Sequence, residues 1–241
     1  MLFQSNLKPW LKKQWCIGQV DGRYLANMED VLELYAQEPQ AGMARLCFDE
    51  RPCQLLQDMV VPLPMQLGKP ERQDNEYGRK GTAVILLAYD IDTGQGYIQV
   101  KPQRTMKDYA QFMEWLAKEH YQHVEKIEMV QDNLNTHSYG SFYDYLPAAD
   151  ARELARKFNF HFTPKHGSWL NMAEIEFSVL ARECLHRRIA SREELEKQVL
   201  IWCEKRNAKA AKIHWSFTVN TAREKLANQY VKVNECNLLH F

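Results

Sequence analysis

Apolar positions along this chain follow two spacings, one typical of strands and one typical of helices. Short apolar runs predict strands, and they lie at residues 44–49, 54–61, 83–89, 97–100, 127–131 and 160–163. Apolar residues repeated at intervals of three and four predict amphipathic helices, and these lie at residues 28–35, 105–116, 150–157, 169–186 and 191–206. Residues 62–81 are rich in proline, glycine and charge, and they predict a long loop.

The order of these elements predicts an α/β fold. A meander of strands comes first, and strands then alternate with helices, which gives a mixed sheet of about five strands flanked by helices. This is also the order of a ribonuclease H-like fold, in which the first and fourth strands lie side by side. We expect a linker or appendage with one amphipathic helix at 1–43, which also carries Trp10 and Trp15, a ribonuclease H-like domain at 44–206, and a tail at 207–241.

Composition narrows the class of protein. No apolar run approaches the ~18 residues that span a membrane, and the N-terminus lacks the pattern of a signal peptide. The six cysteines are scattered without a C-x-x-C pair, which argues against a disulfide framework and against structural zinc. We therefore expect an intracellular protein with no membrane partner.

Charge is distributed unevenly although the formal net charge is zero. Residues 182–225 hold eleven lysines and arginines against six acids, a net charge of +5, whereas residues 1–100 carry a net charge of −3. The positive segment could approach a polyanion, although a solvated helix face explains such runs about equally often. Its candidate contacts are Arg187, Arg188, Lys209 and Lys212.

Three carboxylates stand at predicted element boundaries. Asp49 and Asp132 each end an apolar run, and Glu174 lies just inside a predicted helix. If the first and fourth strands are neighbours, Asp49 and Asp132 meet although 83 residues separate them. Such a set can hold two hard cations and suits the cutting and joining of phosphodiester bonds. A single aspartate at a strand end is more often a turn former or helix cap.

The segments around these acids are Cys47–Glu50, Val130–His137 and Thr163–Glu174, and two later motifs are Trp215–Thr218 and Thr221–Leu226. Together they closely resemble bacterial insertion-sequence transposases of the mariner superfamily, in the IS-six-thirty branch. The resemblance covers nearly the whole chain from residue 44 onward. It implies a DDE transposase, which cuts the ends of its element and joins the freed 3′-hydroxyl to target DNA.

The resemblance also assigns residues. Asp49, Asp132 and Glu174 become the catalytic triad, which binds magnesium or manganese, with two ions expected. Asn133 and His137 then lie at the rim of the site. Just ahead of the third acid come Lys165, His166 and Trp169, which are expected to contact DNA together with Arg187 and Arg188 of the positive segment.

The partners implied by the resemblance are double-stranded DNA, as transposon ends and as a target of TA type. A homodimer is a candidate assembly. Mariner-type transposases normally begin with paired helix-turn-helix domains, which residues 1–43 do not offer. We therefore expect a catalytic domain without the helix-turn-helix domains that recognise the terminal repeats. A separate helix-turn-helix part, encoded in another reading frame, is a candidate partner. The expected location is the bacterial cytoplasm, at the nucleoid.

Several alternatives stay open. The chain could be an inactive or truncated remnant that only binds DNA or dimerises, or another ribonuclease H-like nuclease. The family pattern Asn-Pro-x-Glu lacks its proline here, since Met172 follows Asn171. Glu176 competes with Glu174 for the third position, and helical periodicity does not choose between them because they point ~200° apart. Strand alternation turns Glu50 away from Asp49.

Overall fold

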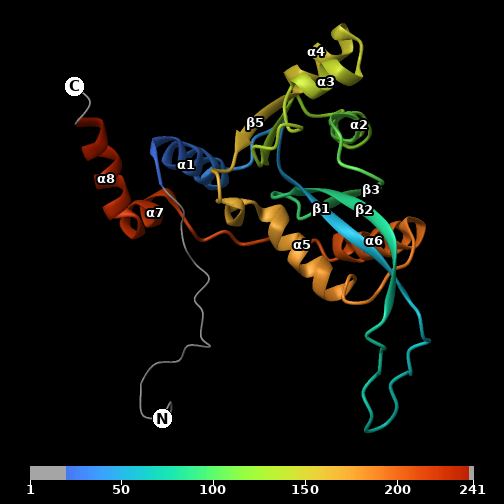
Figure 1. The fold of residues 1–241 in the computed structure, drawn as a ribbon. Coiled ribbons are helices and arrows are strands. Elements are labelled where there is room, and N and C mark those ends of the chain that lie inside the picture. Colours follow the sequence, from blue (N-terminus) through green and yellow to red (C-terminus); the bar gives the residue numbers. More distant parts are fainter. Residues whose placement is uncertain (1–19, 239–241) are drawn as a thin grey trace, which may run out of the picture.

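The computed structural model describes the backbone of residues 20–238 and the side chains of residues 20–233. The first part of the predicted appendage, with Trp10 and Trp15, lies outside the described residues. One mixed sheet of five strands has helices on both faces (Figure 1). Its strands are β1 (Met43–Asp58), β2 (Tyr77–Asp90), β3 (Gly96–Lys101), β4 (Lys126–Gln131) and β5 (Phe158–Phe162). The helices are α1 (Gly22–Ala36), α2 (Met106–Trp115), the π turn η2 (Leu116–His120), α3 (Gly140–Tyr145), α4 (Ala148–Lys157), the 3₁₀ turn η3 (Ser168–Leu170), α5 (Met172–Glu183), α6 (Arg192–Ala208), α7 (Val219–Lys225) and α8 (Ala227–Leu238).

The strand order is β3-β2-β1-β4-β5. β1 runs antiparallel to β2, and β2 antiparallel to β3. β4 runs parallel to β1 on one side and to β5 on the other. The predicted mixed sheet is therefore confirmed, including the expectation that the first and fourth strands are neighbours.

Alternation along the central strands builds a separate core on each face of the sheet. In β2 every residue from Ala83 to Tyr89 is buried, and successive side chains enter opposite cores. One core lies under α1, α5 and α6, and the other under α2, α3 and α4. A strand buried on both faces reads as a continuous apolar run, which explains the run in the sequence.

The predicted strands at 44–49 and 54–61 are wrong as two elements, because β1 continues through residue 58. It stays paired with β2 across a register shift between Gln54 and Leu56. β4 pairs only as far as Cys47, so Pro52 lies where β1 has a single neighbour and a missing N–H is tolerated. The predicted loop at 62–81 is too long, since β2 already begins at Tyr77.

Two isolated bridges, Leu63 to Arg72 and Gln66 to Lys69, extend the β1–β2 ribbon away from the body of the fold (Figure 1). The predicted helix at 169–186 is also interrupted: its first turn is η3, and α5 starts only after Asn171. None of the helices in the described part of the chain combines the length and apolar character needed to cross a bilayer.

Candidate metal and DNA site

The register of the parallel pair β1–β4 brings two of the predicted acids together. Cys47 pairs with Val130, and Asp49 and Asp132 each lie two residues further along. Residues two apart on a strand share a face, and both Cys47 and Val130 belong to the core under α5. Asp49 and Asp132 are thus neighbours at one end of the sheet, on the side where α5 packs.

Asn171 fixes the third acid relative to the first. Its side-chain oxygen accepts a hydrogen bond from the N–H of Ala173 (3.1 Å) and so caps α5. Its side-chain nitrogen donates to the carbonyl of Phe48 (2.8 Å), the residue before Asp49. Glu174 follows in the first turn of α5, where a carboxylate is favoured by the helix dipole.

The structure separates the roles of Glu174 and Glu176. Glu176 is 2% exposed and accepts two hydrogen bonds from the guanidinium of Arg206 on α6, at 2.7 and 3.0 Å. Glu174 is exposed at the end of the sheet, and its charge is felt by Asp49. Glu176 is therefore a structural acid, and Glu174 is the carboxylate available to a ligand.

Asp49 and Asp132 differ in their electrostatic surroundings. Burial raises the pKa of Asp49 to about 7, and repulsion from Glu174 and Asp132 adds to the rise. Burial also acts on Asp132, but the neighbouring His137 outweighs it and holds the pKa of Asp132 below its ordinary value. One acid of the pair is thus ionised at neutral pH, while the other retains a proton in part.

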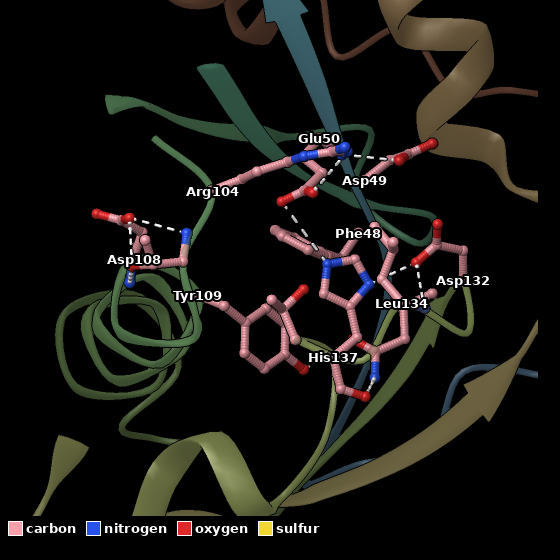
Figure 2. A network of polar contacts seen from close by, with 12 residues as sticks. Phe48, Asp49, Glu50, Arg104, Asp108, Tyr109, Asp132, Leu134 and His137 are labelled. Atoms are coloured by element: carbon pink, nitrogen blue, oxygen red, sulfur yellow. Dashed lines mark hydrogen bonds and ion pairs between the residues drawn. The ribbon is translucent and has the colours of Figure 1, made fainter. Parts of the chain in front are cut away.

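His137 connects Asp132 to residues on the opposite face of β1 (Figure 2). Its Nδ1 lies 2.5 Å from Asp132 Oδ1, and its Nε2 lies 3.7 Å from Glu50 Oε2. Neither ring nitrogen is aligned for a well-formed hydrogen bond, so these are charge contacts. Burial lowers the pKa of His137, but the two carboxylates raise it to about 9. Beyond Glu50, the chain of charge contacts ends at Arg104, whose Nη1 lies 3.4 Å from Glu50 Oε1.

The expectation that His137 lies at the rim of the site is wrong. Its ring is 1% exposed, stacked on Tyr109 (4.9 Å) and edge-on to Phe48 (5.2 Å). Asn133 does lie at the rim, where its side-chain nitrogen donates to the carbonyl of Thr163 (2.6 Å). Glu50 faces away from Asp49 as alternation predicted, yet it supports the site through His137. No sequence signal linked Glu50 to His137, because their contact spans 87 residues.

A cleft of about 970 Å³ adjoins Asp132. Lys165 and His166 line it, on a tight turn closed by the hydrogen bond from Gly167 N–H to the Pro164 carbonyl (2.8 Å). His166 has φ 63°, a left-handed conformation that costs a non-glycine residue energy. At Gly167 a Cβ atom would lie 2.5 Å from Pro164 Cγ, so this turn requires glycine. The turn holds Lys165 and His166 exposed in the cleft that Asp132 also lines.

The other predicted DNA contacts lie elsewhere. Trp169 does not line the cleft; its ring packs edge-on against Phe217 (5.4 Å). Arg188 donates to Asp58 Oδ1 (2.8 Å) and stacks over the Tyr77 ring, at the base of the β1–β2 ribbon. Arg187 is exposed beyond the far end of α5. The structure therefore brings Lys165 and His166 to Asp132 and places both arginines away from it.

The donor set of the three acids suits magnesium or manganese, because these hard cations prefer carboxylate oxygens. Mutual repulsion at Asp49 is relieved by a proton or by a cation. Within residues 20–233, however, no three Asp, Glu, His or Cys side chains lie close enough together to coordinate one metal ion. The acids are coupled through their charges, with Asp132 held at His137.

Comparisons with known proteins decide the family. The family model described as "DDE superfamily endonuclease" matches residues 44–196. This chain belongs to that family. No match was found among curated protein sequences.

Solved structures share the DDE fold. The Mos1 mariner paired-end complex with Mn superposes with a TM-score of 0.55 at 12% identity, over 96% of this chain and 68% of that one. The Mos1 paired-end complex with left transposon end gives 0.56 at 12% identity, over 87% of this chain and 63% of that one. The catalytic domain of Mos1 mariner transposase gives 0.51 at 13% identity, over 83% of this chain and 100% of that one. At these identities the likeness establishes a transposase catalytic-core fold.

Glu174 and Glu176 should respond oppositely to substitution by glutamine. Glu176→Gln should lower the free energy of unfolding by about 2–4 kcal/mol, because it breaks a buried ion pair whose arginine is partly solvated. It should leave magnesium affinity unchanged. Glu174→Gln should weaken magnesium binding and leave stability nearly unchanged. Urea unfolding and isothermal titration measure the two quantities, and the reverse pattern would contradict the assignment.

The stability of the metal-free chain should fall as pH rises through Asp49. The pKa of this acid rises from 3.8 to about 7 on folding, so between these values the native state binds more protons than the unfolded state. The free energy of unfolding must then decrease with pH across this window. Asp49→Asn removes the titration and should flatten this part of the curve. Denaturant titrations at several pH values in EDTA test it, and identical slopes for both proteins would refute it.

Replacing His137 by glutamine should weaken magnesium binding by about 10- to 100-fold, the usual effect of losing a partner of a metal ligand. Glu50→Gln should act in the same direction with less disturbance to packing. His123→Gln is a matched control, since His123 is exposed and away from the acids. If both variants fold and bind magnesium like the control, the contacts of His137 do not orient Asp132.

Proposed function

We propose that this chain is the catalytic domain of a DNA transposase from the bacterial insertion-sequence branch of the mariner superfamily. It cleaves the ends of its element and transfers the 3′-hydroxyl into target DNA. The observation that carries the proposal is the β1–β4 register, which aligns Asp49 with Asp132. Glu174 lies in the first turn of α5, next to the same end of the sheet. The matching segments beside each acid and membership of the DDE family support it.

Asp49, Asp132 and Glu174 would hold the divalent cations, two in the complete site. Cations bound there would supply activation of the attacking hydroxyl and stabilisation of the leaving oxygen. The Mos1 structures with Mn and with Mg support this choice of metal. The imidazole of His137 keeps Asp132 ionised and ready to bind, whereas Asp49 must release its proton first.

Asn133 and His137 restrain Asp132 in different ways, Asn133 through the backbone next to it and His137 through its carboxylate. The Asn133 side chain ties the segment after β4 to the segment after β5 through the Thr163 carbonyl. His137 contacts the carboxylate itself and is backed by Glu50. These contacts restrain the direction of Asp132, and orientation of this kind contributes directly to the rate of phosphoryl transfer.

Duplex DNA is the proposed partner, as transposon ends and as a TA-type target. Lys165 and His166 would contact it next to the acids, and Arg187, Arg188 and Trp169 further away. The Mos1 paired-end and strand-transfer complexes support an assembly on paired transposon ends. A homodimer, with one copy of the chain for each end, is the proposed assembly. The proposed location is the bacterial cytoplasm, at the nucleoid.

Cleavage of duplex DNA that carries the element's terminal repeats tests this function. With magnesium, the chain should cut at the repeat ends, and Asp132→Asn should reduce the rate by about 100-fold or more, since it removes a metal ligand. Asp144→Asn, an exposed aspartate on α3, is the matched control and should retain the rate.

Each other outcome of this experiment contradicts the proposal in a different way. Binding without cleavage would identify a non-catalytic DNA-binding remnant. Preferential cleavage of an RNA–DNA hybrid would identify another ribonuclease H-like nuclease. Equal rates for Asp132→Asn and the control would remove the acids from the reaction.

A further inference from the structure

The cleft beside Asp132 has a wall that the matching catalytic segments do not include. Its lining comes from three segments: the start of α1, the residues after β4 and the residues after β5. From α1 come Arg23, Tyr24 and Asn27, which precede the matched family region at 44–196. The helix predicted as part of an appendage thus faces the same cleft as Lys165.

The cations of the cleft are available to a ligand. Arg23 and Lys165 are exposed, and neither has an ion-pair partner among the residues that the structure describes. The nearby acid Asp21 is engaged, because its carboxylate accepts from the N–H of Tyr24 (2.7 Å) and caps α1. The other acid of the lining is Asp132, which is one of the proposed ligands of the divalent cations. The lining thus holds two cations and two acids, one acid at the cap of α1 and one at the proposed metal site, so an anion is favoured on the side of Arg23 and Lys165.

The two walls are held in place before any ligand binds. On one side, the Thr163 N–H donates to the Gln131 carbonyl (2.9 Å), and the turn that carries Lys165 requires Gly167. On the other side, α1 is anchored by its buried face and by Arg45, whose guanidinium donates to the Leu34 carbonyl (2.9 Å). A preorganised polar cleft loses little entropy when a ligand is bound.

We propose that this cleft binds the sugar–phosphate backbone of the DNA strand that adjoins the scissile phosphate, with Arg23 of α1 and Lys165 on successive phosphates. Asn27 lines the same cleft and can donate to a sugar or a base edge. The inference rests on the proposed function, since it identifies the ligand by its continuity with the acids. It makes α1 part of the DNA-binding surface.

Salt-dependent binding of the full chain to a short fluorescein-labelled DNA duplex tests this role, with calcium as the divalent cation. Arg23→Ala should weaken binding by about 5- to 10-fold at low salt and reduce the slope of log affinity against log salt by about 1, because one phosphate contact is lost. Lys165→Ala should do the same. Asn27→Ala should lower affinity without changing the slope.

Arg152→Ala is the matched control, an exposed arginine on α4 that does not line the cleft. It should keep both the affinity and the slope of the unaltered chain. Unchanged slopes for Arg23→Ala and Lys165→Ala would overturn the cleft proposal even if terminal-repeat cleavage succeeds. Reduced slopes in these two variants would sustain it even if the chain cleaves nothing. Absence of any duplex binding by the unaltered chain would also overturn it.

Discussion

The parallel pairing of β1 with β4 is the constraint on which the site depends. Cys47 opposite Val130 is its last pair, and each acid follows two residues later, Asp49 within β1 and Asp132 directly after the end of β4. A slip of one residue would turn one carboxylate to the other face of the sheet. The buried side chains on both faces of β1 resist such a slip, because each one has its place in one of the two cores.

Asn171 extends this constraint from the sheet to α5. Its side chain caps the helix and also donates a hydrogen bond to the backbone carbonyl next to Asp49. The start of α5, and with it Glu174, is therefore fixed relative to β1. The proline missing from the family pattern would occupy the first helical position, where proline is favoured because its N–H is not needed. Met172 there is 3% exposed and packs in the core. Packing by Met172 and the cap by Asn171 hold the helix start without proline.

The strands and helices could be predicted because each leaves a local pattern, an apolar run or a helical stripe, and the three candidate acids were placed at the ends of those patterns. The pairing of the first and fourth strands was expected from the order of the elements, which is that of a ribonuclease H-like fold. The ion pair between Glu176 and Arg206 leaves no local pattern, and neither does the contact of Glu50 with His137, since the partners are distant in sequence. The continuous β1 was missed because its second half has a single neighbour and carries polar side chains. The place of α1 was missed because amphipathicity reveals a buried face but not the element that covers it.

The positions of the predicted DNA contacts limit how a duplex can lie on this chain. Glu174 and Glu183 are nine residues apart on α5, which is about 14 Å at 1.5 Å per residue, and Arg187 lies beyond the second. A turn of duplex DNA is about 34–36 Å long, more than twice the span of α5 between these two acids. Arg188 already donates hydrogen bonds to Asp58 and to the Glu76 carbonyl. A contact with phosphate would have to replace these bonds, so it would gain little. Of the two arginines predicted from the positive segment, Arg187 is therefore the one whose charge is available to DNA.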